Sequence, residues 1–133
     1  MKYMKSNSIR GLKNRSAGIT GEKVACIFLK NKGFSIIQQN YREKWGEVDI
    51  IALKDGVVRF IEVKSMSVED FSRERSYEPE DLVDSRKLSK VLKVAEFYMQ
   101  RKDDHREFQI DVVAVFLNIG KKIARCRILE QVL

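Results

Sequence analysis

The sequence contains few cysteine, histidine and proline residues. Among its 133 residues there are two cysteines (Cys26 and Cys126), one histidine (His105) and one proline (Pro79). Two distant cysteines and a single histidine cannot supply the closely spaced ligands of a zinc site, so that class of site is excluded. We expect both cysteines to be reduced thiols in the core of a cytoplasmic protein.

Long hydrophobic runs are also absent. No apolar stretch approaches the roughly 20 residues that a helix needs to span a bilayer, and the N-terminal region lacks the apolar stretch of a signal peptide. Hydrophobic residues nevertheless make up 44% of the chain, which is enough to build a core. The sequence therefore predicts one globular domain that does not enter a membrane.

Acidic residues are fewer than basic ones. Lys and Arg number 26 against 19 Asp and Glu, giving a formal net charge of +7. This excess favours an anionic partner, and nucleic acid ahead of a membrane surface. Residues 1–15 are rich in Lys and Arg and contain no acid. We predict a flexible basic tail there, or alternatively a phosphate-contacting arm, followed by a single domain over residues 16–133.

Hydrophobic periodicity predicts the element order helix, three strands, helix, two strands. The predicted helices span residues 16–32 and 79–101, and the predicted strands span 34–41, 46–53, 57–64, 108–117 and 122–129. The polar residues 65–78 indicate a mobile loop. We predict that residues 67–78 form a flap that orders over nucleic acid; the alternative is a disordered insertion without a role. The second helix is a crossover that lays the fourth strand parallel to the third. The predicted fold class is therefore α/β, with a mixed sheet of about five strands flanked by helices.

A β-hairpin is predicted around residues 54–57. Asp55-Gly56 separates two apolar runs, and this dipeptide strongly favours a two-residue turn. Such a turn pairs Lys54 with Val57 and so determines which residues of the two strands face each other. An odd-length turn or a β-bulge would shift that register.

The same register brings charged residues of the two strands together. Asp49 would face Glu62 and Glu47 would face Lys64, with all four side chains on one face of the sheet. Two carboxylates about 4 Å apart repel by ~4 kcal/mol at an effective dielectric constant near 20, and the neighbouring residues are apolar. A hard divalent cation, which prefers oxygen ligands, would relieve this repulsion. The alternative is a solvated charged strand in which Glu47 and Lys64 form a simple ion pair.

Asp49 followed by Glu62-Val63-Lys64 resembles the Asp…(Asp/Glu)-x-Lys motif of the restriction-endonuclease-like nuclease superfamily. The chain is more closely similar to the YraN-like family of uncharacterised bacterial proteins. The matching segments are Gly21-Glu22, Asn40-Tyr41-Arg42, Gly46 to Ala52, Phe60 to Ser65, Lys87 and Asp111-Val112-Val113. The resemblance covers roughly residues 16–117 and implies a mixed sheet like that of Holliday-junction resolvases.

This resemblance implies a role for each matching site residue. Asp49 and Glu62 would bind a metal ion, Lys64 would serve the attacking water, and Glu22 would complete the catalytic set from the first helix. The expected cofactor is Mg²⁺ or Mn²⁺, because Mg²⁺ is commonly held by one or two carboxylates plus phosphate oxygens. The Val63 carbonyl would add a third protein oxygen. Glu22 also has a simpler interpretation as an acid favoured by the helix macrodipole.

Further residues are candidates for contacts with nucleic acid. Arg42, Lys44, Arg86 and Lys87 are each interpreted either as phosphate contacts or as part of a solvated basic surface. Trp45 is interpreted either as a stacking platform for a base or as a partly buried anchor. For two other polar residues we expect no catalytic role: an exposed position for His105, and a structural hydrogen bond for Asp111.

Three functions are compatible with these residues. The first is a metal-dependent nuclease that hydrolyses phosphodiester bonds in DNA, including branched DNA, as a monomer or a homodimer. The second is a nucleic-acid-binding module that keeps the fold without cleavage. The third is an interaction protein whose acidic residues only form ion pairs.

Overall fold

A seven-stranded mixed sheet forms the middle layer of the protein. The computed structural model describes residues 2–3, 7–10, 21–69, 71, 77–118 and 120–133. In chain order, the elements are β1 (Lys2–Tyr3), β2 (Asn7–Arg10), α1 (Gly21–Asn31), β3 (Ser35–Glu43), β4 (Gly46–Lys54), β5 (Val57–Ser67), the 3-10 helix η2 (Pro79–Leu82), α2 (Ser85–Arg101), β6 (Phe108–Asn118) and β7 (Ile123–Glu130). The strand order across the sheet is β1-β7-β6-β5-β4-β3, and β2 also pairs with β7. The predicted α/β fold class and its order of helices and strands from α1 to β7 are confirmed.

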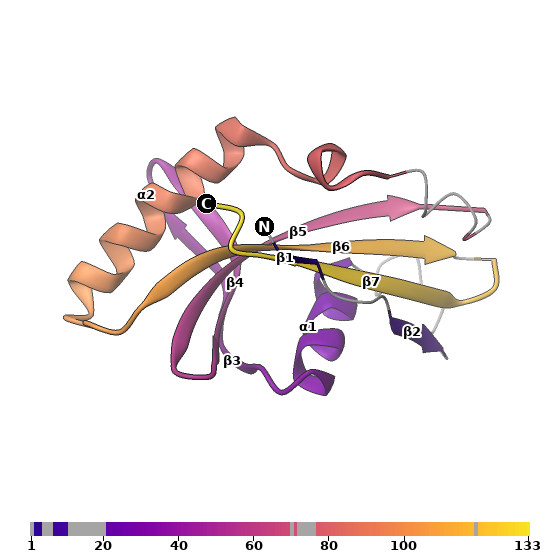
Figure 1. Ribbon diagram of the computed structural model, residues 1–133, viewed down its shortest axis with the longest axis horizontal. Coiled ribbons are helices and arrows are strands. Elements are labelled where there is room, and N and C mark those ends of the chain that lie inside the picture. Colours follow the sequence, from indigo (N-terminus) through magenta and orange to yellow (C-terminus); the bar gives the residue numbers. More distant parts are fainter. Residues whose placement is uncertain (1, 4–6, 11–20, 70, 72–76, 119) are drawn as a thin grey trace.

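Two hydrophobic clusters, one on each face of the sheet, hold the helices in place. On one face, α2 buries an apolar stripe from Leu88 to Met99 against Phe60 and Phe116. On the other face, α1 buries Phe28 and Leu29, and Figure 1 shows the two helices on opposite sides of the sheet. Each fully buried side chain of this kind contributes roughly 1.5–3 kcal/mol. The central strands are therefore supported from both faces.

The β4–β5 hairpin has the predicted two-residue turn. Asp55 and Gly56 both have positive φ angles, 52° and 76°, as a type I′ turn requires. The strands pair in five steps from Lys54–Val57 to Ile50–Ile61, which confirms the predicted register over this stretch.

Beyond Ile50–Ile61 the two strands of the hairpin separate. The β5 strand continues to Ser67 in parallel pairing with β6, as predicted for the crossover, while β4 stays paired with β3 as far as Gly46. We call this separation the fork. Asp49 on β4 and Glu62 on β5 are the first residues on its two arms.

The long predicted helix over residues 79–101 is interrupted. Val83 and Asp84 have extended backbones between η2 and α2. The Asp84 side chain accepts hydrogen bonds from the backbone nitrogens of Arg86 and Lys87, at 3.0 and 3.3 Å. This N-cap gives α2 its own start, because the first backbone N–H groups of a helix lack partners within it.

Within the tail that the sequence predicts to be flexible, the structure has two short strands. Both β1 and β2 pair antiparallel with β7 and cover the edge that β7 would otherwise expose. Such pairing uses backbone groups and needs no apolar pattern, so composition did not indicate it. Residues 16–20 of the predicted first helix, and residues 70 and 72–76 of the predicted loop, lie outside the described residues.

A buried ion-pair network joins β5, β6 and β7 on the hairpin side of the fork. Arg59 Nη1 lies 3.2 Å from Asp111 Oδ2 and 2.8 Å from Glu130 Oε1. The other Asp111 oxygen, Oδ1, accepts hydrogen bonds from the Gln109 side chain and the Gln131 backbone, both 2.8 Å. Asp111 thus has the structural hydrogen bonds expected of it.

Two further expectations concern disulfide bonds and membrane-spanning helices. Cys26 and Cys126 are both buried thiols rather than disulfide partners. Among the helices of the described residues, none has the length and apolar character that crossing a membrane requires.

Candidate active site

Along β4, the regular alternation of side chains between the two faces of the sheet breaks at Asp49. Val48 packs in the α2-side cluster, whereas Ile50, two residues later, packs in the α1-side cluster. Residues two apart in a regular strand would share a face. At the same level of the neighbouring strand β3, Asn40 has a left-handed backbone with φ of 53°, which Asn tolerates better than most residues. The predicted arrangement with four charged side chains on one face is therefore wrong, because this irregularity turns Asp49 out of the alternation.

The Asp49 carboxylate links the two arms of the fork. Its Oδ2 accepts a hydrogen bond of 2.8 Å from the backbone nitrogen of Val63, where a regular ladder would use a backbone carbonyl. This bond directs Asp49 towards β5 and Glu62. The Asp49 carboxylate is within hydrogen-bonding reach of Glu62, and the charge of Asp49 raises the pKa of Glu62. The structure thus brings together the two carboxylates that the hairpin register placed opposite each other.

Glu62 is buried, with 7% of the residue exposed. Burial raises the pKa of Glu62 from 4.5 to about 7; the Lys87 ammonium opposes this rise, and Asp49 adds to it through hydrogen bonding and charge. The negative charge of Glu62 is therefore costly unless a cation lies beside it.

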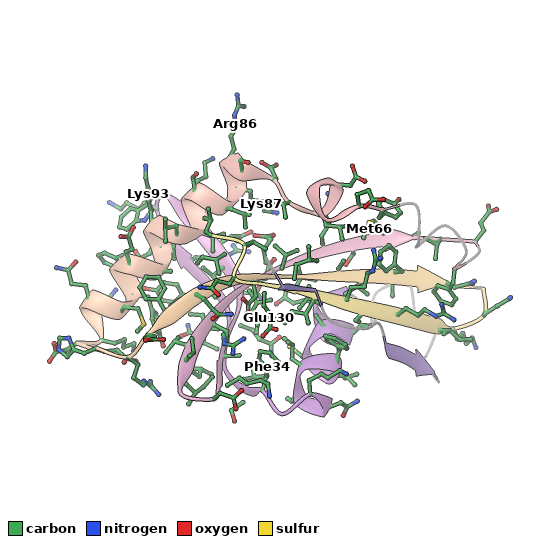
Figure 2. The ribbon with its side chains drawn as sticks, in the orientation of Figure 1. Phe34, Met66, Arg86, Lys87, Lys93 and Glu130 are labelled. Carbon is green, nitrogen blue, oxygen red and sulfur yellow. The ribbon has the colours of Figure 1, made fainter. Side chains whose placement is uncertain are left out.

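Lys87 is the cation paired with Glu62. Its Nζ lies 2.8 Å from Glu62 Oε1, and this contact raises the pKa of Lys87. Lys87 is in the first turn of α2, on the side of the helix nearer to β5 (Figure 2). A cavity of about 160 Å³ opens here, lined by Glu62, Val63, Lys64, Leu82, Asp84, Lys87, Leu88 and Val112.

The predicted pairing of Glu47 with Lys64 is wrong. Glu47 forms an ion pair of 3.0 Å with Arg42 on β3. Lys64 Nζ donates a hydrogen bond of 2.7 Å to the Asp81 backbone oxygen and so ties η2 to β5. The prediction extended the hairpin register past the fork, where the strands no longer face each other. Lys64 still lines the same cavity as Glu62.

Glu22 approaches the fork from the other face of the sheet. A Cβ atom added at Gly21 would overlap the Ser65 side chain, so glycine allows the start of α1 to lie directly on β5. Burial raises the pKa of Glu22, the charge of Asp49 adds to the rise, and a hydrogen bond from Asn40 opposes it. Glu22 Oε1 is buried and has no hydrogen-bond partner among the described residues.

Two residues that shape the site, Asn40 and Asp84, have no role predicted from the sequence. Asn40 hydrogen-bonds to Glu22, and its presence inside a predicted strand was a signal, because Asn is depleted in strands. Asp84 caps α2 and lines the cavity. Its position three residues before Lys87 and four before the apolar stripe is the pattern of an N-cap.

Asp49 and Glu22 are not among the residues that line the cavity, and neither are the remaining predicted residues. Arg42 and Lys44 are exposed at the far end of β3 and in the turn that follows it. Trp45 is 44% exposed and makes an edge contact with Phe97, with ring centroids 5.1 Å apart. His105 is exposed as expected. Of the four predicted phosphate contacts, Arg42, Lys44, Arg86 and Lys87, only Lys87 lines the cavity.

The oxygen donors at the fork suit a hard divalent ion with few protein ligands. Asp49 and Glu62 supply two carboxylates, and the Val63 carbonyl belongs to the same strand as Glu62. Mg²⁺ commonly uses one or two carboxylates and keeps several waters, and the orphaned Glu22 Oε1 is an acceptor for water. Across the described part of the chain, no three Asp, Glu, His or Cys side chains form a ready ligand cluster. Such a site is compatible with Mg²⁺ or Mn²⁺ but not with structural zinc.

The sequence of this chain is similar to a known protein family. The model of the uncharacterised protein family UPF0102 matches residues 21–115, which is most of the chain. The chain belongs to this family. The expected resemblance to the YraN-like family is thereby confirmed at the family level, and the matched residues include every site residue described above.

UPF0102 proteins of similar sequence occur in several Campylobacter species. One from Campylobacter lari is 40% identical over 99 residues, covering 74% of this chain and 82% of the relative. One from Campylobacter jejuni subsp. jejuni strain 81-176 is 42% identical over 105 residues, covering 79% and 88%. One from Campylobacter fetus subsp. fetus is 39% identical over 113 residues, covering 85% and 95%. The UPF0102 name assigns no activity, so the function has to be argued from the site.

Proposed function

We propose that this protein is a metal-dependent nuclease of the restriction-endonuclease-like superfamily that hydrolyses phosphodiester bonds in DNA. The observation that carries the proposal is the convergence of Asp49 and Glu62 at the fork, where burial makes their combined charge costly. Groups with strongly raised pKa values, placed beside a cavity, occur preferentially at functional sites. The net charge of +7 supports an anionic substrate.

The proposed ligands of Mg²⁺ or Mn²⁺ are Asp49, Glu62 and the Val63 carbonyl. When bound, such an ion polarises a phosphate and lowers the pKa of a coordinated water. Lys87 and Lys64 line the cavity and supply positive charge to a phosphate there. Glu22, from the opposite face, accepts a hydrogen bond from water through its orphaned Oε1. Arg42 and Lys44 are proposed phosphate contacts outside the cavity.

Cleavage of labelled nucleic acids tests this proposal. The substrates are single-stranded, duplex, flapped and four-way-junction DNA, with matching RNA, each incubated with Mg²⁺ or Mn²⁺. Wild type is expected to cleave DNA, and Asp49→Asn is expected to lose at least about 10–100-fold in rate, the loss that substitutions of residues supporting metal ligands typically cause. Asp55→Asn, the same change at the exposed hairpin tip, is the matched control and should cleave like wild type. Equal cleavage by Asp49→Asn would contradict the proposal.

A nucleic-acid-binding module without cleavage is the second candidate. It is favoured by the Lys87–Glu62 ion pair, which neutralises part of the carboxylate charge without any metal ion. This candidate predicts that wild type binds nucleic acid, cleaves none of the substrates, and binds equally well with Mn²⁺ or EDTA. Binding that increases on addition of Mn²⁺ and is lost in Asp49→Asn would contradict it.

A further inference from the structure

The outer side of α2 carries a stripe of positive charge. Arg86, Lys90 and Lys93 are four and three residues apart, so they lie on one side of the helix. All three are exposed, and within the described part of the chain their side chains form no ion pair. Figure 2 shows Arg86 and Lys93 extending from α2 away from the sheet.

This spacing weakens the helix. Like charges separated by one helical turn repel, whereas alternating charges at the same positions would attract. The only acid in α2, Glu96, is near the far end of the helix. An external anion lying along the stripe would offset the repulsion.

An aromatic pair lies at the far end of the stripe. Phe97 follows Lys93 by four residues on the same side of the helix, and its ring meets the Trp45 ring at 87°. Trp45 is in the turn between β3 and β4, and nearly half of it is exposed. Gly46 lets this turn lie close against α2, because an added Cβ would lie 3.3 Å from Val94 Cγ2 and 3.5 Å from Lys90 Cβ. The exposed indole is thus held beside the stripe.

The near end of the stripe is next to the cavity, although Arg86 itself does not line it. Arg86 is adjacent to Lys87, and Lys87 and Asp84 both line the cavity. Between Lys87 and Phe97 the helix rises about 15 Å. The stripe therefore leads from the candidate active site to the exposed indole.

We propose that this surface, the α2 track (Arg86, Lys90, Lys93 and the Trp45–Phe97 pair), binds a single strand of nucleic acid that leads out of the cavity. The three cations contact successive phosphates, and an unpaired base stacks on Trp45. Bases in an intact duplex are stacked on their neighbours, so only an unpaired base can make this contact. The inference rests on the proposed nuclease function and specifies its substrate as DNA with a single-stranded segment, such as an end or a branch.

Intrinsic fluorescence tests the stacking contact directly, because Trp45 is the only tryptophan in the chain. Metal-free protein in EDTA is titrated with oligodeoxythymidylate, an abasic oligonucleotide of the same length, a blunt duplex, and oligouridylate. We expect oligodeoxythymidylate to quench Trp45, and the abasic strand to bind without quenching. Comparison with oligouridylate shows whether the track prefers DNA to RNA. Equal quenching by the abasic strand or the duplex would overturn the proposal.

Salt dependence of binding tests the charged stripe. Lys90→Ala/Lys93→Ala is expected to flatten the slope of log affinity against log salt by about 1.4, because each phosphate contact on a single strand contributes about 0.7. The matched control, Lys30→Ala/Lys121→Ala, removes two exposed charges from α1 and from the β6–β7 turn and should keep the wild-type slope. Trp45→Ala should weaken binding by about tenfold or more, with a cooperative thermal unfolding transition as the check on folding.

These binding measurements use no metal and are therefore independent of cleavage. If the lysine and tryptophan variants bind like wild type while Asp49→Asn abolishes cleavage, the α2 track is wrong and the nuclease proposal stands. If quenching and the slope change occur but no substrate is cleaved, the track stands and the nuclease proposal is wrong.

Discussion

At the scale of single residues, Asp49 has two opposed effects on the fold. Its Oδ2 accepts the Val63 N–H and supports the fork, while its charge raises the pKa of Glu62 and of Glu22. Asparagine keeps an acceptor oxygen in nearly the same place and removes the charge. The substitution Asp49→Asn therefore separates the hydrogen bond from the repulsion, whereas Asp49→Ala removes both.

In EDTA near pH 8, Asp49→Asn is expected to raise the free energy of unfolding by about 1 kcal/mol, because it removes a partly screened carboxylate repulsion. Asp49→Ala is expected to be less stable than Asp49→Asn, since the Val63 N–H then lacks its acceptor. Urea denaturation of both variants, with Asp55→Asn as the control, measures these differences. A clear loss of stability in Asp49→Asn would show that the charge itself is structural.

Glu62 is expected to make the stability of the metal-free protein depend on pH. Folding raises the pKa of this carboxyl from 4.5 to about 7, so the folded state holds the proton more tightly than the unfolded state. The contribution of Glu62 to the free energy of unfolding is fully present below its pKa in the unfolded state. It is lost as the pH rises through its pKa in the folded state. Relative to Glu62→Gln, wild type should lose on the order of 1–3 kcal/mol between about pH 5 and pH 8. Curves of unfolding free energy against pH that run parallel for wild type and Glu62→Gln would contradict this prediction.

At the scale of elements, the site depends on how closely the starts of α1 and α2 approach the sheet. Asp84 caps α2 one turn from Glu62's partner Lys87. Gly21 lets α1 lie on β5, because any side chain there would overlap Ser65. Each contact places one charged residue at the fork: Lys87 from one face and Glu22 from the other.

Gly21→Ala is expected to destabilise the protein by about 1–3 kcal/mol, as overpacking of a close contact does. A loss of stability would be informative, because alanine in an unhindered helix is more favourable than glycine by ~1 kcal/mol. Adding Ser65→Gly should restore part of the loss by making room for the new methyl group. Gly120→Ala, where the added Cβ meets only an ordinary contact at 3.7 Å from Asn118, is the control. Chemical denaturation of the four proteins measures the effect, and a stabilised Gly21→Ala would contradict it.

Local signals predicted most of these elements. Asp55-Gly56 predicted the hairpin because the turn conformation is a property of those two residues. The long apolar run of β6 predicted a strand buried on both faces, and the crossover helix predicted its parallel pairing with β5. The predicted register also placed Asp49 opposite Glu62, but in the structure the pairing ends at Ile50–Ile61 and the Val63 N–H, bonded to Asp49 Oδ2, holds Asp49 beside β5.

The fork itself could not be predicted from local signals. It arises because β5 stays paired with β6, which is distant in sequence, while β4 stays paired with β3. The partner of Lys64, the backbone oxygen of Asp81, depends on where η2 lies. The pairing of β1 and β2 with β7 uses backbone groups alone. In each case the deciding contact is tertiary, so no pattern within one segment reports it.

At the scale of the whole molecule, the fork is where the three layers meet. Glu22 reaches it from the α1 face, Lys87 from the α2 face, and Asp49 and Glu62 from the sheet between them. Burial raises the pKa of Glu22 and of Glu62, and the charge of Asp49 adds to both rises, so the ionised carboxylates are costly at this meeting point. A cation bound here would stabilise a contact between layers rather than a single loop.

Divalent ions are therefore expected to stabilise the whole fold. An ion that binds only the folded state adds RT ln(1 + [L]/Kd), or about 2.7 kcal/mol at a concentration of 100 Kd. Wild type should show a higher melting temperature with Mn²⁺ than with EDTA and should bind Mn²⁺ in a calorimetric titration. Asp49→Asn/Glu62→Gln should lose both effects, while Asp55→Asn should keep them. Because phosphate oxygens commonly complete such coordination, a non-cleaved DNA strand should increase the Mn²⁺ affinity of wild type but not of the double variant. Equal shifts for the two proteins would place the ion elsewhere on the molecule.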